Sequence, residues 1–188
     1  MLPSAILFLW FLLSLAIGHL QLLQKVPRPA VQIILFLLTA VLLLFFFFHS
    51  GVRRWIEGLD LRVLILYHLT RFVGIYFLIL YSRGELPYDF AVKGGIGDIT
   101  VATAAIPIAF LPFEKKGSLV ALAVWNLFGL VDILFVVFTA ARLGLKDPES
   151  IRALTVLPLS LLPTFIVPLI IASHVFIGVR IKKMAGGG

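Results

Sequence analysis

Long apolar runs, separated by short polar connections, constrain this chain more than any other feature of its sequence. The first run covers residues 2–23, and a helix of that length, at about 1.5 Å per residue, crosses a hydrocarbon layer of roughly 30 Å. A cleaved signal peptide is the alternative, but a basic leading segment is missing and the run exceeds the roughly 7 to 15 apolar residues of such a peptide. We therefore expect a retained membrane-spanning helix.

The later runs extend this pattern to a whole fold. We expect an all-α integral membrane six-helix bundle that forms a single transmembrane domain over residues 1–183, followed by a flexible tail or cloning remnant at 184–188. Short connections make consecutive helices antiparallel and place both termini on one face. The expected helices cover residues 2–23, 30–48, 61–82, 99–113, 118–143 and 151–180.

The composition agrees with a membrane protein and argues against other classes. Hydrophobic residues make up 61% of the chain, whereas soluble domains are roughly 45–50% apolar. The net charge of +7 comes from basic residues at the ends of apolar runs, which suits lipid headgroups rather than nucleic acid. The sequence contains no cysteine, so disulfides and thiolate metal sites are excluded. Lys and Arg divide almost equally between the two faces, so the positive-inside rule assigns no orientation.

The connection at residues 83–98 is rich in proline and glycine, and we expect it to be broken or re-entrant between the third and fourth helices. Its KGGIGD segment superficially resembles a glycine-rich anion cradle, but no strand precedes it. We favour a tight re-entry, with Asp98 as the N-cap of helix 99–113. Lys93 and Asp98 are then candidates to line an entrance.

Two other segments differ from plain apolar helices. Residues 49–60 form a polar, amphipathic link that we expect to lie in the headgroup layer. The helix at 151–180 contains Pro158, Pro163 and Pro168, each of which removes a backbone donor and frees a carbonyl. We expect this sixth helix to be bent or locally unwound.

A set of polar side chains lies inside the apolar runs, where ionisable groups are costly and indicate a functional site. Counting from the helix ends places all of them within one half of the membrane. These candidate site residues are His68, Arg71, Asn126, Asp132 and His174.

Arg71 is the most informative of them. A guanidinium in the middle of a membrane needs a carboxylate, backbone carbonyls or water, and Asp132 is the only acid well inside any expected helix. We predict that Arg71 and Asp132 form a pair or share a water-filled cavity. The alternative is a purely structural ion pair that fixes the register of the helices.

His68 and His174 lie at similar depths on different helices. One interpretation makes them the axial ligands of a haem b, in a slot lined by small residues such as Gly74, Ala172 and Gly178. The other interpretations are histidines that are hydrogen-bonded to polar groups of the bundle, or histidines that relay a proton or contact a ligand.

Several motifs occur in order along the chain: RFVGIYFL, LPYDFA followed by GGIGD, WNLFGLVD, and LPLSLLPTFIVPL before His174. In this order they resemble a group of small uncharacterised bacterial membrane proteins, over roughly residues 66–175. The resemblance implies a bacterial inner-membrane location and no particular activity.

Function is then expected to centre on the intramembrane site. The first expectation is binding or transport of a small polar or anionic solute coupled to a proton, with Arg71 as the anion anchor, Asp132 as its counter-ion and His68 or His174 as the proton partner. A haem b electron-transfer subunit that acts with quinone is the second. A structural or assembly subunit of a larger membrane complex is the third.

The sequence also bears on catalysis and on oligomeric state. The chain lacks HExxH and GxSxG motifs, which argues against an enzyme. Its small size makes a homodimer the expected form of a transporter.

Overall fold

The computed structural model describes residues 2–26 and 30–186, and every regular element in these residues is helical. Within the described residues, five stretches are long and apolar enough to cross a membrane: Ala30–Phe48, Leu61–Ser82, Tyr88–Ala109, Lys116–Lys146 and Leu162–Gly186. The first helix, α1 (Leu2–His19), is also apolar but shorter than these. The all-α prediction is therefore confirmed.

The elements follow one another along the chain as α1, η1 (Leu22–Gln24), α2 (Ala30–Phe48), α3 (Ser50–Glu57), α4 (Leu61–Leu66), η2 (Tyr67–Phe72), α5 (Val73–Ser82), α6 (Tyr88–Ala109), α7 (Lys116–Lys146), η3 (Pro148–Thr155), η4 (Leu162–Ile166) and α8 (Val167–Gly186). Residues 27–29, which include Arg28 in the predicted first connection, lie outside the described part of the chain.

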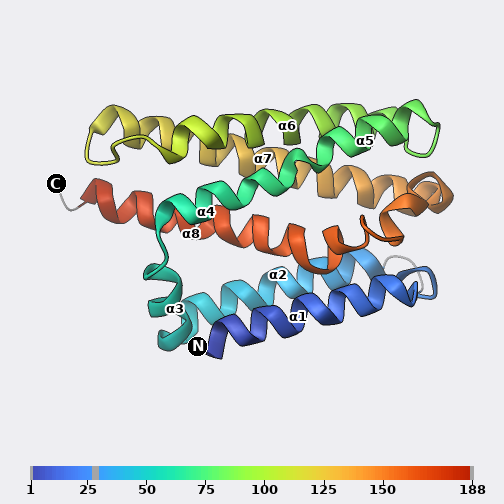
Figure 1. The fold of residues 1–188 in the computed structure, drawn as a ribbon, viewed down its shortest axis with the longest axis horizontal. Helices are drawn as coiled ribbons and strands as arrows, with labels where there is room; N and C mark the ends of the chain where they lie inside the picture. The colour runs from blue at the N-terminus through green and yellow to red at the C-terminus, as the bar shows by residue number, and fades with distance from the viewer. Residues whose placement is uncertain (1, 27–29, 187–188) are drawn as a thin grey trace.

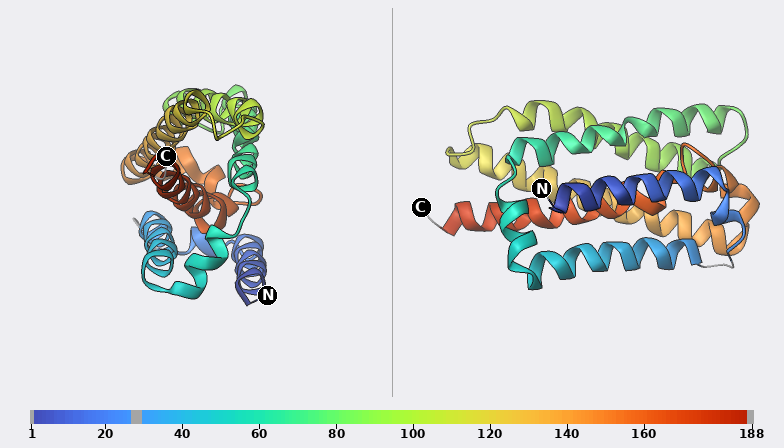
Figure 2. Two further views of the ribbon diagram at one scale, coloured as in Figure 1. Left: turned by 90° about the vertical axis from the view of Figure 1, so that its left-hand side faces the viewer. Right: turned by 60° about the horizontal axis from the view of Figure 1, so that its bottom comes forward.

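Helix α8 lies at the centre of the bundle, with α1 and α2 on one side and α4 to α7 on the other (Figure 1). The end-on view in Figure 2 shows the same arrangement. Helix α8 belongs to the most buried of the five long stretches, whereas α2 is the least buried. Helix α1 begins and α8 ends at the same end of the bundle (Figure 1). Many large apolar side chains, such as those of Phe8 and Phe138, remain exposed around this core, as expected for surfaces in contact with lipid.

Helix α3 is the polar link expected at residues 49–60, and it runs across one end of the bundle between α2 and α4 (Figure 1). Asp60 caps the next helix, because its side chain accepts a hydrogen bond of 2.9 Å from the backbone N–H of Arg62. Arg180 of α8 donates to the carbonyls of Ile56 (2.8 Å) and Glu57 at the C-terminal end of α3. Helix α8 therefore holds α3 against the bundle.

The prediction of a broken or re-entrant connection at residues 83–98 is wrong. Helix α6 begins at Tyr88, so the glycine-rich segment lies inside the helix and Asp98 is in its interior rather than at its N-cap. Glycine disfavours helices in water, but here it permits close packing. A Cβ atom on Gly95 would lie 2.9 Å from the carbonyl oxygen of Gly74, so α5 and α6 approach each other at a distance that only glycine allows.

The expected sixth helix also differs from the structure. Residues 151–161 are not part of the long helix, which starts with the π-helical segment η4 and continues as α8 to Gly186. Pro168 has no N–H for the carbonyl of Thr164 four residues earlier. Trp10 Nε1 (2.9 Å) and Ser14 Oγ (3.2 Å) of α1 donate to that carbonyl instead. The segment predicted as a flexible tail at 184–188 is thus helical as far as Gly186, and residues 187–188 lie outside the description.

Candidate functional site

The first part of the site is an ion cluster around Arg71, whose side chain is 1% exposed. Its Nε lies 2.6 Å from Oδ1 of Asp98, and its Nη2 contacts Oδ2 of Asp132. Its Nη1 donates to the backbone carbonyl of Gly129 at 3.0 Å. The guanidinium therefore joins η2 to α6 and α7, and the pairing of Arg71 with Asp132 expected from the sequence is present.

Asp98 was predicted as an N-cap, and its role as a partner of Arg71 in this cluster was not predicted. It is 3% exposed and lies on the face of α6 that carries Gly94, Gly95, Val101 and Ala102, all of which are buried. The helical spacing of these residues extends back into the glycine-rich segment, and this spacing would have predicted a helix. We predicted a loop instead, because the segment is rich in glycine.

Two glycines make room for the cluster and its neighbours. A Cβ atom on Gly97 would overlap the carboxylate of Asp132, so that carboxylate rests directly on the backbone of α6. A Cβ atom on Gly129 would lie 2.6 Å from Cε1 and 2.9 Å from Nε2 of His174. The glycine at position 129 therefore brings the ring of His174 close to the carbonyl that binds Arg71.

The second part of the site is a pair of buried histidines. The rings of His68 and His174 are in contact, with centroids 4.2 Å apart, and Trp125 packs edge-on against His68. Segment η2 is a 3₁₀-helix, in which side chains three residues apart are eclipsed, so it presents His68 and Arg71 in line. All five residues predicted for the site therefore lie in two adjoining clusters.

Hydrogen bonds assign a tautomer to each histidine. Asn126 Nδ2 donates to the carbonyl of His174 at 3.1 Å, so its Oδ1 accepts from Nδ1–H of that ring at 2.9 Å. Ser173 Oγ donates to the carbonyl of Ile170 at 2.8 Å, so it accepts from Nε2–H of His68 at 3.1 Å. The remaining ring nitrogens, Nδ1 of His68 and Nε2 of His174, are buried without a hydrogen-bond partner in the described part of the chain.

This geometry does not fit a haem. Two axial histidines bind iron from opposite faces of the porphyrin, which must lie between their rings. The rings of His68 and His174 touch each other, and Nε2 of His68 is hydrogen-bonded to Ser173. The pair has no space for a macrocycle, so we derive no electron-transfer role from it.

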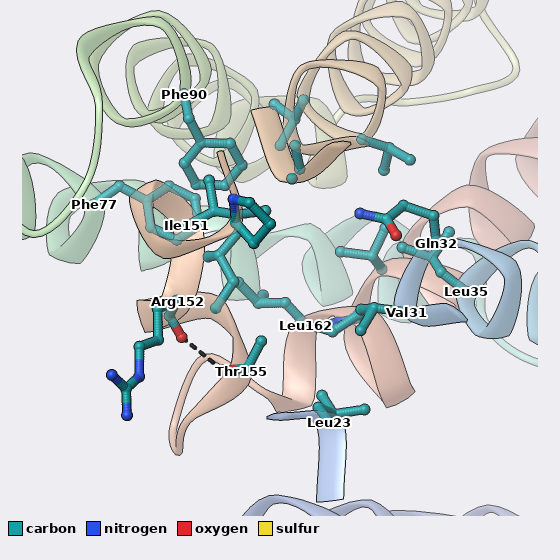
Figure 3. A pocket seen from close by; sticks show the side chains of 18 of the residues that line it. Leu23, Val31, Gln32, Leu35, Phe77, Phe90, Ile151, Arg152, Thr155 and Leu162 are labelled. Atoms are coloured by element: carbon teal, nitrogen blue, oxygen red, sulfur yellow. Dashed lines mark hydrogen bonds between the residues drawn. The ribbon is translucent and has the colours of Figure 1, made fainter. Parts of the chain in front are cut away.

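A cavity of about 390 Å³ reaches the ion cluster from one end of the bundle. Arg71 and Asp98 lie at its inner end, and apolar side chains such as Phe77, Phe90 and Leu35 form its walls. Figure 3 shows the two phenylalanines on one side, Gln32 and Leu35 on the other, and Ile151 between them. The polar residues nearer the end of the bundle are Gln24, Gln32, Glu149, Arg152 and Thr155.

A family model matches residues 28–181 of this chain. The chain belongs to that family, described as a domain of unknown function (DUF8737). The DUF8737 match includes the ion cluster, both histidines and most of the cavity lining, whereas α1 lies outside it. No curated protein and no solved structure matches the chain. The resemblance to a family without an assigned activity is therefore confirmed, and its bacterial origin stays a prediction.

Not every predicted site residue of this DUF8737 member reaches the cavity. Asn126, Asp132 and both histidines lie behind the cluster and do not line it. Lys93 is exposed, pairs with Asp89 at 2.7 Å, and does not line the cavity either. Asp98 does line it, but from the buried inner end rather than as part of an entrance loop.

Proposed function

We propose that this protein is a six-span membrane protein that binds and carries a small solute through the cavity ending at Arg71 and Asp98. The observation that supports it is the combination of apolar walls with one charged pair at the inner end. Ligand sites are typically apolar cavities with a few polar groups that set orientation. We infer a solute with an apolar body and a single polar group.

Irregular helices at this place favour transport over static binding. Segment η2, a 3₁₀-helix, carries Arg71, and the π-helical segment η4 contributes Leu162 and Pro163 to the lining. Interrupted helices at mid-membrane are typical of transporters, because the interruptions act as hinges near the bound solute. We propose η4 as the moving part, since its proline-containing backbone lies beside the cavity.

An anionic solute is less well supported than a polar one. Three nitrogen atoms of Arg71 already donate to Asp98, Asp132 and the carbonyl of Gly129. An anion would have to displace a carboxylate from the guanidinium and would face both carboxylates at close range. The role of Arg71 in this proposal is to hold the acids in place rather than to anchor an anion.

A structural role is the competing proposal, because the same cluster ties η2, α6 and α7 together. The two proposals differ in what the cavity does. A scaffold has no need of it, whereas a solute-binding protein fails when it is filled.

The test is cavity filling with a matched control in lipid nanodiscs. Ala140→Trp places a large side chain in the cavity, and Val131→Trp places the same side chain on the exposed face of the same helix. The probes are octylamine, octanol and octanoate, measured by equilibrium binding of the radiolabelled compounds. We expect at least one to bind saturably to the unaltered protein and to Val131→Trp but not to Ala140→Trp. Saturable binding that survives Ala140→Trp, or no saturable binding of any probe, contradicts the proposal.

A further inference from the structure

The charges of the ion cluster do not balance. One guanidinium, that of Arg71, faces two carboxylates, those of Asp98 and Asp132. The side chains of the two acids are 4% and 12% exposed, so water screens neither of them well. With both acids ionised the cluster would hold an uncompensated negative charge in a low-dielectric interior, which is strongly unfavourable.

No other side chain in the neighbourhood supplies the missing positive charge in the described structure. The titratable groups that face the cluster are His68 from η2 and His174 from α8, and both are neutral according to their hydrogen bonds. Glu149 and Arg152 line the cavity from η3, but they pair with each other at 3.6 Å. The compensating charge must therefore come from a proton or from an occupant of the cavity.

The position of Asp98 shows where an occupant would meet this charge. Its Oδ1 accepts from Arg71, and within residues 2–26 and 30–186 the structure contains no hydrogen bond to its Oδ2. Asp98 lines the cavity, whereas Asp132 lies behind it with its carboxylate against Gly97. A positively charged group that enters the cavity can reach Asp98 without disturbing Arg71.

We propose that the solute is a protonated amine with an apolar body, and that it replaces a proton held by the Asp98 and Asp132 carboxylates. In the empty state one of the two is a carboxylic acid, so the cluster is neutral. When the alkylammonium enters, the O–H bond of that acid breaks, its proton leaves the protein, and the ammonium group pairs with the carboxylate. Total charge is conserved, and no redox step is involved. This inference rests on the proposed solute-binding function and names its substrate class.

The experiment compares octylamine, octanol and octanoate on the protein in nanodiscs. We expect octylamine to bind at least ~10-fold more tightly than the other two, because only it compensates the buried charge. While the amine stays protonated and the empty cluster holds its proton, amine affinity should rise by up to ~10-fold per pH unit, since amine and proton compete. A pH indicator in weakly buffered solution should record about one proton released per bound amine.

Asp98→Asn and Asp89→Asn provide a matched pair, because each removes one negative charge from α6 and only Asp98 lines the cavity. Asp98→Asn leaves Arg71 with one carboxylate, a neutral pair that should fold. We expect it to lose the amine preference and the proton release, while Asp89→Asn keeps both. Proton release is measured on the unaltered protein, so the inference stays testable if Asp98→Asn does not fold.

The outcomes separate this inference from the function on which it rests. If octanol or octanoate binds as tightly as octylamine, or if amine binding releases no proton, the amine–proton exchange is wrong. If that binding is still abolished by Ala140→Trp, the cavity remains a solute site for another class of molecule. Binding that Ala140→Trp leaves unchanged overturns both.

Discussion

Nε of Arg71 lies 2.6 Å from Oδ1 of Asp98, although 27 residues separate them in the chain. This contact crosses from a 3₁₀ segment to the middle of the neighbouring long helix. It adds a second acid to a pair that the sequence had limited to Arg71 and Asp132, so the cluster contains one more acid than it has guanidinium groups.

Arg71→Gln should destabilise the protein by roughly 3–5 kcal/mol, because it leaves the one ionised carboxylate of the Asp98 and Asp132 pair buried without its cation. The triple variant Arg71→Gln, Asp98→Asn, Asp132→Asn removes all three charges and should recover most of that loss. The stabilities of the single and triple variants are measured by unfolding in mixed micelles with an increasing fraction of denaturing detergent. Equal stability of the single and triple variants would show that the cluster holds no buried ionised carboxylate.

Gly97→Ala should cost about 1–3 kcal/mol, since the added methyl group overlaps the carboxylate of Asp132 and forces the helices or the ion pair to shift. Gly117→Ala is the matched control, because outside its own helical turn no atom of the described residues lies within 4 Å of a Cβ at that position. The control should be neutral or slightly stabilising. Thermal unfolding measures the stability of both variants. If Gly97→Ala is as stable as Gly117→Ala, then Gly97 is not needed to accommodate the carboxylate of Asp132.

Trp10→Phe combined with Ser14→Ala should cost roughly 1–3 kcal/mol beyond lost packing, because the carbonyl of Thr164 then loses both donors in a dry interior. Either single change should cost less, since one donor remains. Pro168→Ala supplies a backbone N–H and should reduce the penalty of the double change. A cycle of unfolding free energies measures this coupling, and strictly additive effects would argue that α1 does not satisfy the carbonyl.

Glu57 connects the end of α3 to the end of α8, where its carboxylate accepts hydrogen bonds from Lys183 at 2.6 Å and Arg53 at 3.0 Å. These hydrogen bonds lower the pKa of Glu57 below its usual 4.5, and the hydrogen bond from Lys183 contributes most. The lowered pKa stabilises the folded state above about pH 4.5, and this contribution is lost as the pH falls through the lower folded pKa. The protection of the α3 amides, taken relative to the intrinsic exchange rate at each pH, should therefore decrease below about pH 4.5, and this decrease should be absent in Glu57→Gln.

Much of the helical fold followed from the sequence, because long apolar runs leave the backbone few alternatives. Apolar runs that must satisfy their own backbone groups become helices, and Arg71 inside such a run requires a carboxylate, so its contact with Asp132 was predictable. The histidines and Asn126 were predicted as candidate site residues for the same reason. Their hydrogen bonds to each other and to Ser173 depend on how α8 is rotated, which no local pattern specifies.

Only the tertiary structure decided the conformation of segments whose residues have weak or unfavourable helix propensity. The glycines before Asp98 favour a turn when taken alone, and they form a helix because Gly74 of α5 and Val136 of α7 pack where side chains would otherwise be. The carbonyl freed by Pro168 is satisfied by α1, more than 150 positions away in the chain. The sequence by itself determined that a charge lies within an apolar run and needs a partner. The packing of three helices determined that it has two partners, and that one of them lines a cavity.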